Sequence, residues 1–431
     1  MTDTTATPMT CPVTGAGAAG APADPDAPIA LDPFVTDLVG EGARLRAAGP
    51  LARVVLPGGV SAYAVTHHTA ARALLTDPRV VKDIDRWTAW QRGEIAPDWP
   101  LIGLVNPGRS MLTVDGPEHR RLRLLVAQAL TVRRVEHLRG NIEAITNSLL
   151  DALSAHTADE VVDLKALFAA PLPMKVVTEL MGVEQVVSPR LTAVFDRFFS
   201  SETEPGEMPR VIAEIDEIFT GVIEEKRGTA SDDLTSALLN ASEEGDRLTD
   251  EELLNTIKVM IIAGHETTIS LILQAVIGLE THPDQRARVL AGEVPWEAVI
   301  EETLRWSTPT THVLMRYATE DVPVGDDVLP EGEALVVSFG ALGRDERVHG
   351  ETAEDFDVTR ESGTKHISFG YGPHVCPGAA LARLEAAVAL PALYARFPDL
   401  TLAVPAAELR NKPVVTQNDL AEVPVRLGKR V

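Results

Sequence analysis

Cys376 stands in the stretch FGYGPHVCPGAALARLE (residues 369–385), between a glycine-rich loop and an alanine-rich run. A cysteine binds a metal or attacks a substrate as its thiolate, and the free backbone N–H groups at a helix N-terminus lower its pKa. Because the alanine-rich run is a strong helix former, we expect Cys376 to lie at such a terminus with a lowered pKa. Gly370, Gly372 and Gly378 permit positive φ angles and a close approach of the backbone to a flat partner.

The residue type alone leaves several roles open to Cys376. Zinc binding is disfavoured, because no second cysteine lies nearby and His374 is not at a usual ligand spacing. A hydrolase nucleophile would need a His-Asp arrangement, and the sequence shows none apart from His374. A lone cysteine is more often a small buried hydrophobe than a ligand or a nucleophile. The neighbouring residues do not decide between these interpretations.

A second polar cluster, AGHETT at 263–268, interrupts a long apolar helical pattern. An acid and a hydroxyl in mid-helix are costly to bury, and Gly264 costs about 1 kcal/mol of helix propensity relative to alanine. A helix kink with a solvated polar face would explain the cluster by itself. The alternative is a functional site that uses Glu266 and Thr267.

Two further pairs have helical spacing. Glu302 and Arg305 are one turn apart, and the plain interpretation is a surface ion pair worth a few tenths of a kcal/mol. His119 and Arg123 belong to a segment, 119–139, that carries six arginines and one glutamate. Such a run is usually a solvated helix face, although it would also suit an acidic protein partner or a clamp for anionic groups.

The composition limits the kind of protein. With 45% hydrophobic residues in 431, the chain can bury a substantial core. Its net charge of −24 argues against nucleic acid or an anionic membrane as the main partner. The longest apolar runs fall short of the roughly 20 residues needed to cross a bilayer, so we expect no membrane segment. Two cysteines and an N-terminus unlike a signal peptide favour the cytoplasm.

Helical patterns dominate the rest of the chain. Apolar residues at spacings of three and four predict helices at 117–130, 140–156, 208–228 and 249–280. The last of these begins with a capping box formed by Thr249 and Glu252. Its middle is apolar on all sides, so we expect this helix to be buried.

Strand patterns are short and occur at 51–66, 314–339 and 414–428. No internal repeat and no linker divides the chain after about residue 30. We therefore predict a mainly α fold with small peripheral β-sheets, as a single domain over residues 31–431. Residues 1–30, which include Cys11, are predicted to be a disordered tail.

The pattern Phe369-Gly370-x-Gly372-x-His374-x-Cys376-x-Gly378 resembles the haem-binding signature of the cytochrome P450 superfamily. AGHETT and Glu302-x-x-Arg305 resemble two further signatures of that family in the same order. The likeness covers about residues 30–431 and is greatest to soluble actinobacterial members. It implies the single-domain cytochrome P450 fold and haem b with Cys376 as axial thiolate and metal ligand.

The resemblance also assigns roles to further residues. Glu266 and Thr267 would be the catalytic acid–alcohol pair that manages protons during dioxygen activation. Glu302 and Arg305 would form a buried structural network with Arg360. The remaining cofactor contacts are the ring contacts Phe369, Ala263, Gly264 and Gly378 and the propionate contacts His119, Arg123, Arg316 and His374.

The implied function is a monooxygenase that hydroxylates a C–H bond of a bulky lipophilic molecule, of steroid, macrolide or terpenoid type. No flavin, nicotinamide or iron–sulfur motif occurs, so electrons would come from a ferredoxin and an NAD(P)H-dependent ferredoxin reductase. The alternative is a haem-binding sensor or carrier, which needs no acid–alcohol pair. The family topology predicts pocket residues that include Met111, Met260, Val313 and Gln417, with Asn418 as a second polar anchor.

Overall fold

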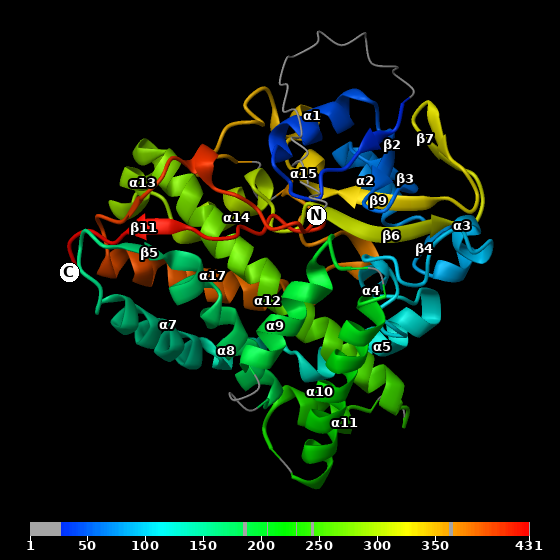
Figure 1. The fold of residues 1–431 in the computed structure, drawn as a ribbon, viewed down its shortest axis with the longest axis horizontal. Coiled ribbons are helices and arrows are strands. Elements are labelled where there is room, and N and C mark those ends of the chain that lie inside the picture. The colour runs from blue at the N-terminus through cyan, green and yellow to red at the C-terminus, as the bar shows by residue number, and fades with distance from the viewer. Residues whose placement is uncertain are drawn as a thin grey trace, which may run out of the picture.

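A computed structural model describes residues 27–183, 188–204, 206–229, 231–242, 245–361 and 365–430. Helices form most of the molecule, and the larger β-sheet lies at one side of it (Figure 1). This arrangement confirms the predicted mainly α fold with small sheets. Most of the predicted tail, including Cys11, lies outside the described residues.

The long predicted helix is the centre of the fold. It forms α12 (Asp250–Thr281) and begins with the expected capping box: Thr249 Oγ1 accepts the Glu252 N–H, and the Glu252 carboxylate accepts the Thr249 N–H. α12 packs against the helices α8, α10, α14 and α17. By length and hydropathy it could cross a membrane, but 78% of its apolar window is buried within the protein. The burial identifies α12 as a core helix.

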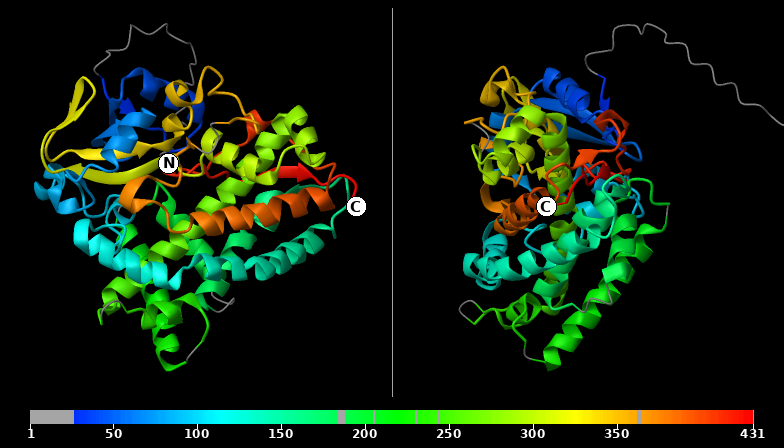
Figure 2. Two further views of the ribbon diagram at one scale, coloured as in Figure 1. Left: turned by 180° about the vertical axis from the view of Figure 1, so that it is seen from behind. Right: turned by 90° about the vertical axis from the view of Figure 1, so that its left-hand side faces the viewer.

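The other helices surround α12 on several sides (Figures 1 and 2). Besides α12, the three other helices predicted from spacing are present as α5, α7 and α10, and their ends lie within about four residues of the expected bounds. In the N-terminal half the helices are α1 (Leu38–Ala47), α2 (His68–Leu74), α3 (Thr88–Gln91), α4 (Ile102–Val105), α5 (Gly116–Ala129), α6 (Val132–His137), α7 (Arg139–Leu153), α8 (Pro171–Met181), α9 (Ser188–Phe199), α10 (Met208–Gly228) and α11 (Leu234–Asn240). After α12 follow α13 (Pro283–Leu290), α14 (Trp296–Trp306), α15 (Phe339–Leu342), α16 (Glu346–His349) and α17 (Ala379–Arg396).

The larger sheet has six strands in the order β1-β2-β3-β9-β6-β4. Its strands are β1 (Ile29–Ala30), β2 (Leu51–Leu56), β3 (Val60–Val65), β4 (Val80–Val81), β6 (His312–Ala318) and β9 (Ala334–Ser338). A two-stranded sheet pairs β7 (Val322–Val324) with β8 (Asp327–Leu329). A three-stranded sheet joins β5 (Val161–Asp163), β10 (Thr401–Leu402) and β11 (Pro424–Arg426).

Two predicted boundaries differ from the structure. Ile29 and Ala30 were expected in the tail, but they pair in parallel with β2, so the folded part includes them. Of the strand predicted at 414–428, residues 424–426 form β11. The part around 417 is instead a turn with isolated bridges, because its backbone pairs with Thr310. This turn carries Gln417 toward the centre of the molecule.

Glu302 and Arg305 form a buried network rather than a surface ion pair. Two guanidinium nitrogens of Arg305 each lie 2.7 Å from a carboxylate oxygen of Glu302, and both side chains are at most 2% exposed. Arg360 Nε lies 3.3 Å from Glu302 Oε1, as the resemblance implied. Arg305 also donates to the backbone carbonyls of Gly343 and Ala353. The network therefore joins α14 to the segment that leads toward Cys376.

We expect the substitution Arg305→Leu to lower the free energy of unfolding by about 3–5 kcal/mol, because it removes both hydrogen bonds from Arg305 to the buried Glu302 carboxylate and a donor to three backbone carbonyls. Urea denaturation of the purified protein measures this change. Arg190→Leu is the control, since Arg190 forms a half-exposed ion pair with Glu214 and should cost less than about 1 kcal/mol. Equal effects of the two substitutions would contradict a structural role of the network.

Candidate active site

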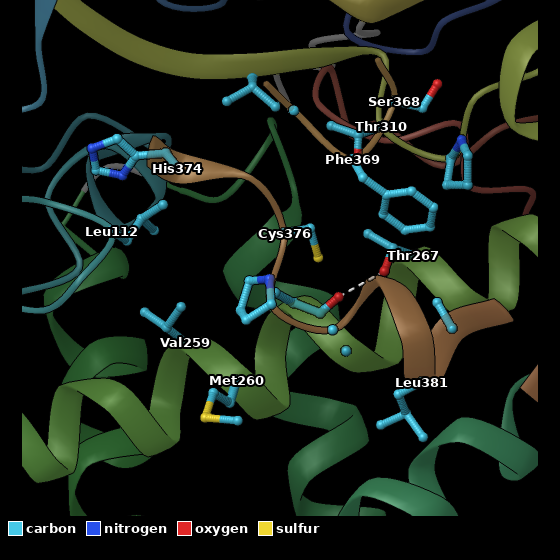
Figure 3. Close-up of a pocket in the computed structure, with 18 of the residues that line it drawn as sticks. Leu112, Val259, Met260, Thr267, Thr310, Ser368, Phe369, His374, Cys376 and Leu381 are labelled. Atoms are coloured by element: carbon cyan, nitrogen blue, oxygen red, sulfur yellow. Dashed lines mark hydrogen bonds between the residues drawn. The ribbon is translucent and has the colours of Figure 1, made fainter. Parts of the chain in front are cut away.

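The loop before α17 holds Cys376 in a fixed turn. The Cys376 N–H donates to Phe369 O at 2.7 Å, and the Gly370 N–H donates to Ile367 O at 2.7 Å. Gly370 and Gly372 have φ of +80° and +75°, which disfavours residues with a side chain. A Cβ atom on Gly372 would also lie 2.9 Å from Leu75 O. The sulfur of Cys376 points from this loop into a cavity (Figure 3).

The prediction of a lowered pKa for Cys376 is wrong for the protein chain by itself. Burial raises the pKa of the Cys376 thiol and outweighs the backbone N–H groups of Gly378 and Ala379 and the charge of Arg123, which lower it. A helix terminus is thus too weak to ionise this thiol, whereas a coordinated metal ion deprotonates a thiol directly.

The cavity in front of Cys376 has a volume of about 320 Å³ and lies between α12 and the Cys376 loop. It brings together residues far apart in the chain. The predicted site residues that line it are Met111, His119, Arg123, Met260, Ala263, Gly264, Thr267, Val313, Arg316, Phe369, His374, Cys376 and Gly378.

The middle of α12 forms one wall of this cavity. Thr267 Oγ1 donates to Ala263 O at 2.7 Å, and Thr268 Oγ1 donates to Gly264 O at 3.1 Å. These bonds give the mid-helix hydroxyls partners four residues earlier, an arrangement that often bends a helix. A Cβ atom on Gly264 would have no neighbour closer than 3.9 Å, so the glycine leaves open space on the cavity side.

Glu266 is not among the residues that line the cavity. Consecutive helical residues are about 100° apart, and the Glu266 side chain is buried among charged groups instead. His265 Nδ1 lies 3.1 Å from its Oε1. Burial opposes ionisation, but His265, Lys412 and Lys165 lower the pKa of Glu266, so it is a carboxylate at neutral pH. The predicted catalytic pair is therefore divided, with Thr267 at the cavity and Glu266 in a charged cluster.

This charged cluster continues to the protein surface. Lys165 Nζ lies 2.5 Å from Asp419 Oδ1, and Lys412 Nζ lies 3.6 Å from Asp419 Oδ2. Lys412 Nζ also lies 2.7 Å from Asp196, whose side chain is about half exposed. Glu266 and Asp196 thus lie at the two ends of a cluster in which acidic and basic side chains alternate.

One end of the cavity carries more positive than negative charge. Four predicted propionate contacts meet there: the rings of His119 and His374 have centroids 4.2 Å apart, and Arg123 and Arg316 line the same cavity. Within the described residues, no carboxylate oxygen lies within 4 Å of either guanidinium. His119 Nε2 and His374 Nδ1 are buried and have no hydrogen-bond partner there.

Sequence reasoning missed two residues at this end, Lys82 and Asp115. Asp115 accepts hydrogen bonds from the Lys82 backbone N–H at 2.6 Å and from His374 Nε2 at 3.1 Å. Lys82 Nζ donates to Met315 O at 2.8 Å, next to Arg316. Asp115 precedes a helix and looks like a cap, and no sequence pattern indicates its contact with a residue 259 positions later.

The pKa values of the basic residues at this end are lowered by burial and by the neighbouring positive charges. Burial and the charge of Arg316 lower the pKa of Lys82 to about 7. Burial lowers the pKa of Arg316 to about 10. Burial and the charges of Arg316, Lys82 and His119 lower the pKa of His374 to about 4, although Asp115 opposes this shift. A ligand with carboxylates at this end would offset the electrostatic repulsion between these cationic side chains.

A buried acid, Glu385, was also missed. It lines the same cavity from α17, and its Oε2 has no hydrogen-bond partner in the described structure. Burial raises its pKa to about 8, so it is mostly protonated at neutral pH. The sequence feature that could have identified Glu385 is its position as a single acid on an apolar face of the alanine-rich helix.

A second cavity, of about 220 Å³, adjoins the first. Both are lined by Ala263, Thr267, Thr310 and Val313. Gln417 lines the second cavity, in agreement with its predicted place. Asn418 lines neither. Its amide donates to Ser307 Oγ at 3.0 Å, so it supports the turn instead.

These features fit haem b. The fold offers a sulfur ligand, a glycine-lined wall for a flat ring, and a buried positive end with unpaired nitrogens for two propionates. The cytochrome P450 profile matches residues 173–291 and 296–416, more than half of the chain. The chain belongs to the cytochrome P450 family. Members of this family are haem-thiolate monooxygenases, so the cofactor is haem b with Cys376 as axial ligand.

Several relatives span nearly the whole chain. The 2-hydroxy-5-methyl-1-naphthoate 7-hydroxylase of Streptomyces carzinostaticus is 39% identical over 94% of this chain and 98% of its own length. The 6-deoxyerythronolide B hydroxylase of Saccharopolyspora erythraea is 34% identical over 92% and 97%. The solved structure of testosterone-bound CYP154C4 from Streptomyces sp. ATCC 11861 is 68% identical, covers 94% of this chain and 99% of that one, and has a TM-score of 0.92.

The contact between Asp115 and His374 leads to a prediction about haem retention. Replacing Asp115 with Asn removes the carboxylate that orients His374, so the ferric protein should lose haem about tenfold faster, a typical effect of a residue behind a ligand. Transfer of haem to excess apomyoglobin measures this rate. Asp85→Asn, an exposed change on the short 3₁₀-helix Ile84–Arg86, is the control. An unchanged rate in Asp115→Asn would contradict the positioning role.

Proposed function

We propose that this cytochrome P450 hydroxylates a C–H bond of a bulky lipophilic small molecule, with a steroid as the favoured class. Two adjoining apolar cavities carry this proposal: Cys376 and Thr267 both line the first cavity, and Thr267 also lines the second. Most of the lining is apolar, as in small-molecule pockets generally. The similar protein solved with testosterone supports a steroid, whereas the macrolide-type hydroxylase among the relatives makes a macrolide the second candidate.

The proposal assigns a task to each of the site residues. Bound haem supplies dioxygen activation, and Cys376 holds it through the sulfur while the residues at the positive end bind its propionates. Thr267 holds a proton at Oγ1 on the distal wall. Glu266 passes protons inward from the charged cluster. The apolar walls exclude water and orient the substrate. We place this protein in the cytoplasm, as the sequence predicted.

A sensor or carrier function is the alternative, and Thr267 argues against it. A carrier has no use for a cavity hydroxyl at Thr267 that is next in sequence to Glu266, a buried carboxylate in a charged cluster that reaches the surface. The family assignment to monooxygenases agrees with an enzyme.

The proposal is tested with purified holoenzyme and a surrogate ferredoxin and reductase. A strongly red-shifted Soret band of the reduced protein with carbon monoxide is expected and should be lost in Cys376→Ser. Testosterone should shift the haem from low to high spin and give a hydroxylated product. Thr267→Ala and Glu266→Gln should lower the product formed per NAD(P)H at least tenfold, since positioned proton transfer contributes about 10²–10⁴-fold.

Ser270→Ala is the control for these substitutions, because Ser270 is buried in the same helix but lines neither cavity. A normal yield of product in Thr267→Ala and Glu266→Gln would contradict their proposed roles. A thiolate spectrum without any response to steroids, but with a response to macrolides, would replace the favoured substrate class.

The proposed electron donor is an acidic ferredoxin that docks near α6, which packs against α17, the helix that follows Cys376. The expected patch of six arginines is smaller than its sequence suggested. Arg123 faces the cavity, and the partners of Arg121, Arg134 and Arg139 are acids of this chain. Arg120 and Arg133 are exposed, and within the described residues neither has an acidic partner within 4 Å.

We expect Arg133→Glu to raise the KM for ferredoxin several-fold and to weaken its salt dependence, because complementary charge governs docking. The measurement compares turnover at ionic strengths of about 0.05 and 0.5 M. Arg210→Glu on α10 introduces the same charge change elsewhere. Salt-insensitive turnover of the unaltered enzyme would count against electrostatic docking.

A further inference from the structure

His312 lines the second cavity from the start of β6 and is nearly completely buried, at 1% exposed. Its Nε2 lies 2.9 Å from Glu41 Oε1, on α1. Its other ring nitrogen, Nδ1, is buried and has no hydrogen-bond partner within the described residues. A buried nitrogen without a partner is costly, so its place beside a cavity indicates a ligand.

Glu41 determines which hydrogen bond His312 has left to offer. The Glu41 carboxylate is itself buried, and its second oxygen accepts the Asp32 backbone N–H at 2.8 Å. A carboxylate accepts hydrogen bonds, so the ring proton of His312 lies on Nε2. Nδ1 is then the ring nitrogen left to accept, and a group that donates a hydrogen bond would satisfy it.

Two more unpaired polar atoms belong to residues of the same cavity. Thr416 Oγ1 and Gln417 Oε1 are buried and have no partner within the described structure. Gln417 Oε1 is an acceptor, and a hydroxyl such as that of Thr416 can accept as well as donate. The other walls are largely apolar and include Leu104, Phe198, Phe199, Ile212, Ile215 and Ile262.

The second cavity is thus an apolar chamber with hydrogen-bond acceptors in its lining. A carbonyl group could accept from the Thr416 hydroxyl or the Gln417 amide, but it would leave His312 Nδ1 without a partner, whereas a hydroxyl would donate to Nδ1. Cys376 lines the first cavity but not the second. A substrate that reacts near Cys376 would therefore place its opposite end in this chamber.

We propose that His312, held by Glu41, selects substrates that carry a hydroxyl group at the end remote from the reacting carbon. The substrate hydroxyl donates to His312 Nδ1, and no bond is made or broken in this contact. The inference rests on the proposed lipophilic, steroid-like substrate and adds to it the chemistry of one end. His312 is in this sense a specificity residue and takes no part in the oxidation.

The first experiment uses the unaltered holoenzyme and two matched pairs of steroids. Testosterone and androstenedione differ in a hydroxyl or carbonyl at one end, and androstanediol and dihydrotestosterone differ in the same way at the other end. We expect the alcohol of at least one pair to bind about tenfold more tightly in spin-shift titrations, a difference of about 1.4 kcal/mol. Equal affinities within both pairs, or tighter binding of the ketones, would overturn the proposal.

The second experiment assigns this preference to His312. His312→Phe should abolish it, whereas His312→Asn, which keeps a polar atom near Nδ1, should retain part of it. Thr311→Val is the control, because Thr311 is buried beside His312 but bonds to Val415 O and lines neither cavity. A preference that survives in His312→Phe would overturn the role of His312.

The outcomes separate this inference from the proposed function. A spin shift with steroids but no alcohol preference refutes the role of His312 and leaves the steroid proposal standing. No shift with any steroid, in a protein with a thiolate-type carbon monoxide spectrum, refutes both. The comparison of ligand pairs uses the unaltered enzyme, so it can refute the proposal even if His312→Phe folds poorly.

Discussion

The buried positive charge at one end of the first cavity is the constraint on which the site depends. Burying a cation without a counter-ion is expensive, and here Arg316, Arg123 and Lys82 lie at one end of a cavity, beside the rings of His119 and His374. The carboxylate of Asp115 offsets part of this charge and fixes His374. The remainder favours an anionic ligand, so haem binding and folding of this region stabilise each other. By contrast, Glu302 neutralises the charge of Arg305 within the chain, and that network needs no ligand.

α12 serves the site through two different faces. Its cavity face carries Thr267 and the open space at Gly264, and another face carries Glu266 into the cluster of Lys165, Lys412 and Asp419. One helix can thus separate a dry reaction space from a row of charges that reaches the surface. In the proposed function, a proton that moves from Glu266 to Thr267 would pass between adjacent residues of α12.

The sequence was sufficient for the parts of the site that depend on local pattern. The glycines around Cys376, the capping box at Thr249 and the four long helices follow from spacing and residue type, and the structure confirms them. The buried state of Glu302 came from resemblance, since an i,i+3 pair looks the same on a surface. Asp115 and Lys82 escaped notice because their partners are distant in the chain, and the raised pKa of Cys376 escaped because burial is a property of the whole fold.

The same reasoning explains why the substrate end was the hardest part to read. Gln417 could be placed by topology, but His312 looked like an ordinary residue at the start of a strand. Its proposed role depends on Glu41, which lies 271 positions away and occupies the Nε2 ring nitrogen of His312 in a hydrogen bond. A histidine with both nitrogens free could accept or donate, and would discriminate poorly between an alcohol and a ketone. A histidine whose proton is held by a buried carboxylate is committed to accept. Selectivity in this chamber therefore arises from α1, an element that lines neither cavity.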